Sequence, residues 1–235
     1  IKRWKSVFPS HEYDTNYGLS ESIGPGCVHL GVENIHKVVP ISKSELDEYL
    51  GLDLGNPTIL VTYHPVTLKG KECQIINDFL LALQDYREYQ ILFTMPNSDP
   101  GSDVIRKAII EYAKRDENRI KIFTSLGLRR YLSVIPYVKA VVGNSSSGII
   151  EVPSFGVPTL NIGDRQKGRI MADSVICCDD DYASIKKGLE YVLSDEFYNI
   201  SKRAISPYDK KGTADTIFRV IKDCDLGIVK KFYDI

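Results

Sequence analysis

Long hydrophobic runs and an excess of charge of either sign are both missing from this sequence. No apolar stretch reaches the roughly 18 residues that a membrane-spanning helix needs. The 30 basic and 31 acidic side chains leave a formal net charge of -1, which predicts no general attraction to nucleic acid or to an anionic membrane. Any site that binds an anion must therefore be local.

Cysteine is scarce and is not arranged as a disulfide framework. The five cysteines are odd in number, show no Cys-x-x-Cys spacing, and include two neighbours, Cys177 and Cys178, in an apolar stretch. This usage is typical of a reducing compartment. Because no secretory leader is seen either, the expected location is the cytoplasm.

Several motifs of well-known enzyme classes are also absent. No G-x-G-x-x-G follows a predicted strand, and there is no P-loop lysine motif and no G-x-S-x-G elbow. His11, His29 and His36 lack carboxylate or cysteine partners at metal-ligand spacing. These absences argue against dinucleotide oxidoreductases, P-loop NTPases, serine hydrolases and a metal site.

The chain does contain a regular βα pattern. Its 235 residues, 43% apolar and 26% charged, suit one globular domain with an appendage. From about residue 57 onward, short β-branched runs alternate with amphipathic segments, which predicts a doubly wound parallel α/β sheet with its ligand at the carboxyl ends of the strands. The predicted strands are 58–62, 91–94, 120–123, 140–142, 159–162 and 175–177. Five helices are predicted among these strands. One covers 72–87, one begins after a cap at Ser102 or Asp103, and one lies around 131–135. Another carries Ile185, Leu189 and Val192, and the last begins at Thr213.

The segment Gly143-Asn-Ser-Ser-Ser-Gly148 lies where a buried strand turns into a helix. Its small residues let a phosphate approach, while backbone N–H groups, serine hydroxyls and the helix dipole favour an anion there. The alternative, equally weighted from spacing alone, is that Ser145 or Ser146 only caps a helix.

Three further side chains follow predicted strands or the serine segment. Glu151 can accept hydrogen bonds from the hydroxyls of a sugar, and Arg165 can meet a phosphate or a carboxylate. His64 can donate a proton or a hydrogen bond to an oxygen that gains charge, because its ordinary pKa lies near working pH. Taken singly, each has a plainer explanation: Glu151 as a solvated glutamate, Arg165 as a surface arginine and His64 as a structural histidine.

Together, four segments in order and spacing resemble the hydrolysing UDP-N-acetylglucosamine 2-epimerases. The resemblance extends from about residue 23 to the end and includes Ser206-Pro-Tyr208. Non-hydrolysing relatives look like T-H-R-R-E-N at the first segment, so the hydrolysing branch is favoured. The segments are Tyr63-His-Pro-Val-Thr67, Met95-Pro-Asn-Ser-Asp-Pro-Gly-Ser102, Gly143-Asn-Ser-Ser-Ser-Gly-Ile-Ile-Glu151 and Gly156-Val-Pro-Thr-Leu-Asn-Ile-Gly-Asp-Arg-Gln-Lys-Gly-Arg169.

The resemblance implies one Rossmann-like lobe of a glycosyltransferase-B-type, two-lobe enzyme that grips the UDP part of UDP-GlcNAc. By position, Ser145 and Ser146 match diphosphate-binding serines, and Glu151 matches a ribose-binding glutamate. The remaining matches are Asn97 and Arg165 as substrate-side residues, His64 as the histidine beside the diphosphate, and Leu126 as the position whose backbone meets the uracil.

The reaction that the resemblance implies needs no cofactor. The C2 proton of the sugar is removed, UDP leaves to give 2-acetamidoglucal, and water adds to yield free N-acetylmannosamine, a sugar of sialic acid biosynthesis. The acids and bases that act at C2 are expected in an amino-terminal lobe of the same enzyme. Because the chain begins with Ile1 rather than Met, we expect that lobe to be absent from it.

On this basis we expect three parts. Residues 1–50 form an inter-lobe segment with a short helix capped by Ser42 or Ser44. Residues 51–205 form the Rossmann-like UDP-binding domain, and residues 206–235 form a helix and tail that pack back toward the amino-terminal lobe. A glycosyltransferase lobe of the same architecture and a non-catalytic nucleotide-sugar binding module remain alternatives, as do a GDP-linked or modified sugar and a homo-oligomer.

Overall fold

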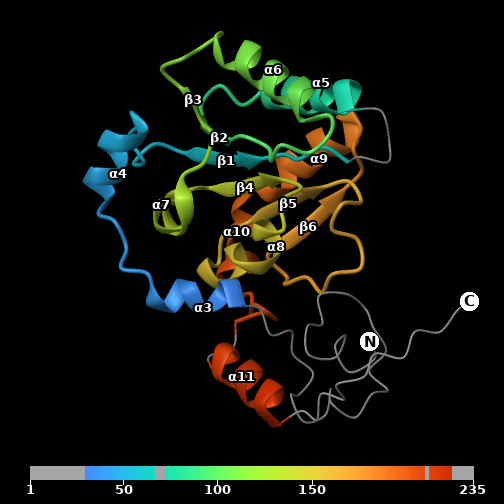
Figure 1. The fold of residues 1–235 in the computed structure, drawn as a ribbon. Coiled ribbons are helices and arrows are strands. Elements are labelled where there is room, and N and C mark those ends of the chain that lie inside the picture. Colours follow the sequence, from blue (N-terminus) through green and yellow to red (C-terminus); the bar gives the residue numbers. More distant parts are fainter. Residues whose placement is uncertain (1–29, 67–71, 210–211, 224–235) are drawn as a thin grey trace, which may run out of the picture.

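The computed structural model describes residues 30–66, 72–209 and 212–223 (Figure 1). The expected inter-lobe segment before residue 30 and the expected tail after residue 223 lie outside these residues, as does Thr67 of the first motif. Among the described helices, none combines the length and the apolarity needed to cross a membrane.

A six-stranded sheet forms the centre of the described chain, and every pair of neighbouring strands is parallel. The strand order is β3-β2-β1-β4-β5-β6, which is the order of a doubly wound Rossmann sheet. All six predicted strands and the predicted fold class are confirmed. The strands are β1 Thr58–Thr62, β2 Gln90–Thr94, β3 Ile120–Phe123, β4 Ala140–Gly143, β5 Thr159–Ile162 and β6 Val175–Cys178.

Helices cover both faces of this sheet (Figure 1). On one face, Ile59 and Val61 of β1 pack in a buried cluster with side chains of α5, α6 and α9. On the other face, Leu60 packs in a cluster with side chains of α4 and α7. The helices are α3 Leu30–Lys37, α4 Lys43–Leu50, α5 Glu72–Leu83, α6 Ser102–Ala113, α7 Gly127–Val134, α8 Ser147–Ile150, α9 Tyr182–Val192, α10 Asp195–Arg203 and α11 Thr213–Asp223, with 3-10 turns at Ile135–Tyr137 and Val152–Phe155.

Most of the predicted helices are confirmed, with differences at their ends. Ser42 caps α4 in a capping box with Glu45, as expected. Helix α5 ends at Leu83 rather than at 87, because the chain then turns through the hydrogen bond from Tyr86 N–H to the Leu83 carbonyl. The predicted cap of α6 is wrong: Gly101, with φ 89°, holds that position and makes no side-chain bond.

Two helices, α3 and α10, were not predicted, and they differ in whether the sequence carries a signal for them. Helix α10 has sequence signals, since Ser194 caps it and Asp195 and Glu196 lie in its first turn. Helix α3 has no clear apolar period, and it packs against α11. Glu33 on α3 accepts a hydrogen bond from the Ala214 N–H at 3.2 Å. The expected packing of α11 against another lobe remains a prediction.

The ends of β1 and β4 approach each other so closely that only glycine fits at residue 143. Gly143 has φ 140°, and a Cβ there would lie 2.0 Å from the Thr62 carbonyl oxygen. That oxygen also accepts a hydrogen bond from the Asn144 N–H at 3.2 Å. The two strand ends that flank the middle of the sheet are therefore held in direct backbone contact.

We expect Gly143→Ala to destabilise the fold severely, by more than about 4 kcal/mol, because the added methyl group would overlap a carbonyl. Gly127→Ala is the matched control, since Gly127 also has positive φ, at 66°, but a Cβ there would meet nothing within 4 Å. The control should lose only about 1–2 kcal/mol. Urea denaturation compares the two, and equal losses would show that backbone conformation, not the contact with Thr62, governs residue 143.

Candidate functional site

Six of the seven predicted site residues gather at one edge of the sheet because each follows the carboxyl end of a strand, and Glu151 follows α8. His64 follows β1, Asn97 follows β2, and Leu126 follows β3. Ser145 and Ser146 follow β4, and Arg165 follows β5. Since β1 and β4 are neighbours from which the sheet is wound in opposite directions, this edge contains the switch point at which doubly wound folds bind ligands.

Asn144 joins three of these loops. Its side chain, which is fully buried, accepts a hydrogen bond from the His64 N–H at 2.7 Å and donates one to the His64 carbonyl at 2.8 Å. Its own carbonyl accepts from Arg165 at 3.1 Å and from Gln166 at 2.8 Å. Asn144 thus fixes His64 relative to the serine loop and to the loop after β5.

The sequence assigned no separate role to Asn144 or to Gln166. Asn144 was noted only as part of the glycine and serine segment, and Gln166 only as part of the fourth motif. Both are buried, at 0% and 2% exposure, and buried amides need partners. An amide directly after a buried strand was the available signal, but its partner lies 80 residues away.

His64 is held as a neutral ring. Its side chain is buried, with 7% exposure, and Nδ1 accepts a hydrogen bond from the Asn97 N–H at 3.3 Å, which places the proton on Nε2. Burial, aided by the charge of Arg165, lowers the pKa of His64 from 6.5 to about 4, against a smaller opposing effect of Asp99. The expected pKa near working pH is therefore wrong, and His64 can act as a neutral N–H donor.

The serine loop leaves its donors available. Ser146 stands at the N-cap position of α8 but makes no side-chain capping bond, and Ser145 Oγ only accepts a long 3.4 Å bond from the Ser147 N–H. The N–H groups of Ser145 and Ser146 form no hydrogen bond with the described part of the chain. Because α8 has only four residues, these groups, rather than a helix dipole, would meet an anion.

Glu151 lies at the end of α8 and offers an unused acceptor. Its Oε2 is buried and has no hydrogen-bond partner among the described residues. Nearby, the Ser147 hydroxyl donates to the Tyr131 hydroxyl at 2.8 Å. Burial raises the pKa of Tyr131, and the charge of Glu151 adds to that rise. A buried carboxylate oxygen without a donor is suited to accept a hydrogen bond from a ligand hydroxyl.

The other predicted residues lie at this edge in different ways. Leu126 is 2% exposed and packs its side chain in the second cluster, so it offers only its backbone. The side chain of Asn97 is exposed, and Arg165 is exposed apart from its bond to the Asn144 carbonyl. Within the described residues, no group of three or more His, Cys, Asp or Glu side chains is placed to hold a metal ion.

The chain resembles known proteins along most of its length. The family described as UDP-N-acetylglucosamine 2-epimerase matches residues 29–222. The GDP/UDP-N,N'-diacetylbacillosamine 2-epimerase (hydrolyzing) of Campylobacter jejuni is 36% identical over 67% of this chain and 41% of its own length. The polysialic acid biosynthesis protein P7 of Escherichia coli is 34% identical over 88% of this chain and 53% of its own length. The chain thus spans about half the length of the curated relatives it matches.

A solved structure shares the fold. UDP-GlcNAc 2-epimerase from Neisseria meningitidis bound to UDP-GlcNAc superposes with a TM-score of 0.65 over 87% of this chain and 57% of that protein, at 16% identity. The likeness in three dimensions extends well beyond the likeness in sequence.

We expect the pKa of His64, followed by NMR of its ring nitrogens, to lie near the value of about 4 given by burial and Arg165. Arg165→Gln should raise that pKa and Asp99→Asn should lower it, since their charges act in opposite directions. Neutral His64 favours the folded state above pH 6.5, and this contribution is lost as the pH falls to about 4. A pKa near 6.5 in the folded chain would contradict the buried, neutral ring.

Proposed function

The chain belongs to the UDP-N-acetylglucosamine 2-epimerase family, and from this we propose that it is the nucleotide-binding lobe of a hydrolysing UDP-N-acetylglucosamine 2-epimerase. The observation that carries the proposal is the switch-point edge, where buried His64 and the open serine loop are tied together by Asn144. The edge combines neutral donors for a diphosphate with a carboxylate for sugar hydroxyls. It needs no cofactor.

In the proposed reaction, UDP-GlcNAc and water give N-acetylmannosamine and UDP. Loss of the C2 proton and departure of UDP form 2-acetamidoglucal, and water then adds across its double bond. This chain stabilises the negative charge that develops on UDP through the N–H groups of Ser145 and Ser146, the serine hydroxyls, Arg165 and the Nε2–H of His64. Glu151 accepts from the ribose hydroxyls, the backbone at Leu126 meets the uracil, and Asn97 lies on the substrate side.

His64 in this role stabilises charge without transferring its own proton. A ring with a pKa of about 4 is already neutral near pH 7, so it donates a hydrogen bond from Nε2 to an oxygen of the diphosphate. The groups that remove the C2 proton and deliver one to C2 belong to the amino-terminal lobe. The chain alone is therefore expected to bind nucleotide without turnover.

Two observations support the hydrolysing branch. The first motif reads Tyr63-His-Pro-Val rather than T-H-R-R, and two relatives carry the word hydrolyzing in their names, from Campylobacter jejuni and Legionella pneumophila. Those two names also specify N,N'-diacetylbacillosamine linked to a nucleotide, which makes that modified sugar the second candidate substrate. The description of the family names UDP-N-acetylglucosamine, which supports UDP-GlcNAc as the first.

The function is tested by following UDP-GlcNAc by proton NMR in deuterated water, first with this chain and then with the protein that also contains the amino-terminal lobe. Deuterium at C2 of released N-acetylmannosamine is expected only with both lobes. Product from this chain alone would refute the need for a second lobe. Transfer of the sugar to an acceptor, without exchange at C2, would instead identify a glycosyltransferase. The same experiment with UDP-linked N,N'-diacetylbacillosamine tests the second candidate substrate.

We expect His64→Ala in the two-lobed protein to lower turnover about 100-fold or more, the scale of removing a donor to a developing oxyanion. His36→Ala is the control, because His36 pairs with Asp209 on the surface and follows no strand of the site. Steady-state rates are compared at matched thermal stability. Unchanged turnover in the His64 variant would leave this residue with a structural role.

Glu151→Gln should weaken binding of UDP about 10-fold, since one charged acceptor is lost while the side chain keeps its shape. Glu48→Gln, at an exposed position on α4, should leave the affinity unchanged. Isothermal titration of UDP into this chain measures both. Equal binding of 2′-deoxy-UDP to the wild type and to the Glu151 variant would support the assignment of Glu151 to the ribose. An unaltered affinity of the Glu151 variant for UDP would remove this residue from the site.

A further inference from the structure

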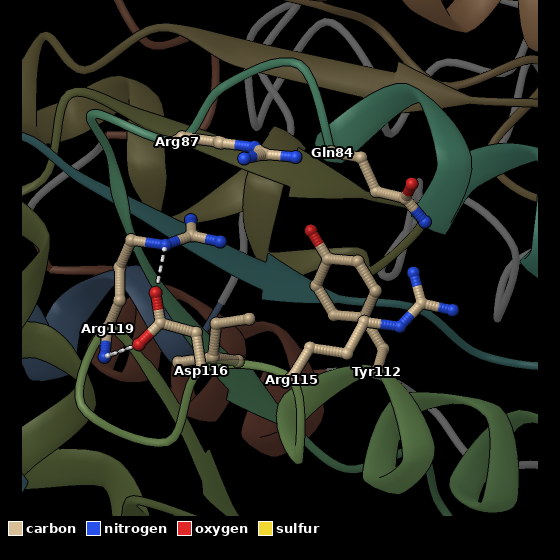
Figure 2. Close-up of a pocket in the computed structure, with 7 residues that line it drawn as sticks. Gln84, Arg87, Tyr112, Arg115, Asp116 and Arg119 are labelled. Carbon is tan, nitrogen blue, oxygen red and sulfur yellow. Dashed lines mark hydrogen bonds and ion pairs between the residues drawn. The ribbon is translucent and has the colours of Figure 1, made fainter.

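A pocket lined by three arginines lies at the opposite edge of the sheet from the nucleotide site. Its volume is about 250 Å³, and it opens between the ends of α5 and α6 and the start of β3 (Figure 2). Its residues precede strands β2 and β3, whereas those of the nucleotide site follow strands. The principal lining residues are Gln84, Arg87, Tyr112, Arg115, Asp116 and Arg119.

Positive charge is concentrated in this pocket although the chain as a whole has a net charge of -1. Arg119 is held in place by Asp116, 3.2 Å from its Nε, and by the Tyr89 carbonyl, which accepts from it at 2.7 Å. Arg87 and Arg115 form no ion pair with the described residues, and Arg115 lies over the ring of Tyr112, 5.7 Å from its centre. Two of the arginines that line the pocket thus have no carboxylate partner among the described residues.

Tyr112 supplies a second, independent sign of a missing ligand. The residue is only 3% exposed, and its buried hydroxyl finds no acceptor for its proton among the described residues, although the Arg119 guanidinium approaches it as a donor. In Figure 2 the hydroxyl points into the space between Arg87 and Arg119. Burial raises the pKa of Tyr112, against the charge and the hydrogen bond of Arg119 and the charge of Arg115, so the group is a neutral O–H donor. A buried donor with no acceptor is costly unless a ligand supplies one.

We propose that this pocket binds the phosphate group of a small phosphorylated molecule, separately from the nucleotide site. Guanidinium groups match the paired oxygens of a phosphate, and the Tyr112 hydroxyl adds one more donor. The volume of about 250 Å³ lies below the roughly 300–1,000 Å³ typical of sites for drug-sized ligands. The pocket therefore holds a phosphate and a small attached group rather than a nucleotide sugar.

The test is a titration of this chain with inorganic phosphate and with a hexose 6-phosphate, followed by amide and arginine Nε signals in NMR. Both probes should shift the signals of Arg87, Tyr112 and Arg119, and the hexose phosphate should bind more tightly. Equal affinity of the two probes would overturn the assignment to a phosphorylated molecule and favour free phosphate as the ligand. Shifts confined to the Ser145 loop, or no saturable shifts, would overturn the site.

Variants separate this pocket from a structural arginine cluster and from the nucleotide site. Arg87→Gln combined with Arg115→Gln should raise the dissociation constant of the hexose phosphate at least about 10-fold, and Tyr112→Phe, which keeps the packing, should raise it several-fold. Arg203→Gln, in the exposed last turn of α10, is the charge-matched control and should have no effect. Unchanged affinity in the Tyr112 variant and the double variant would overturn the proposal.

The same set of proteins keeps the two sites distinguishable. His64→Asn should weaken the binding of UDP and leave the affinity for the hexose phosphate unchanged. The double arginine variant should leave the binding of UDP unchanged. Loss of both ligands in either variant would show that they share one site and would overturn a separate pocket.

Discussion

The contact between the ends of β1 and β4 is the constraint on which the rest of this structure depends. Gly143 brings the β4 backbone against the Thr62 carbonyl, and Asn144 then hydrogen bonds to both backbone groups of His64. These bonds satisfy a fully buried amide and fix the backbone of His64, while the Asn97 N–H holds its ring at Nδ1. The serine loop, the loop after β5 and His64 therefore occupy one rigid arrangement, because a single residue touches all three.

The sequence predicted the fold well, because the fold follows from local periodicity. Alternating β-branched runs located all six strands, and buried positions such as Ile185 and Leu189 were evident from helical spacing. The gathering of the candidate residues at one edge also followed, since the order of parallel strands brings strand-end residues together there. The less accurate features were helix ends, as at Gly101, where backbone conformation rather than a polar side chain forms the cap.

What the sequence could not provide was the environment of individual groups. The low pKa of His64 arises from burial and from Arg165, which is distant in the chain, and the central role of Asn144 depends on a partner after another strand. The arginine pocket has the same origin, since Arg87 and Arg115 come from separate βα units and show no motif. Each of these features requires the three-dimensional neighbours, which no local pattern reports.

The joining of β1 to β4 also bears on how the chain acquires its binding edge during folding. Thr62 pairs with Gly143 in the neighbouring strand, although β2 and β3 lie between them in the sequence. The loop that must close is therefore long, and its closure is entropically slow. A chain in which only β1, β2 and β3 have paired lacks the serine-loop side of this edge. A ligand that recognises only the completed edge stabilises the whole sheet by mass action, so under the proposed function nucleotide binding and completion of the fold are thermodynamically linked.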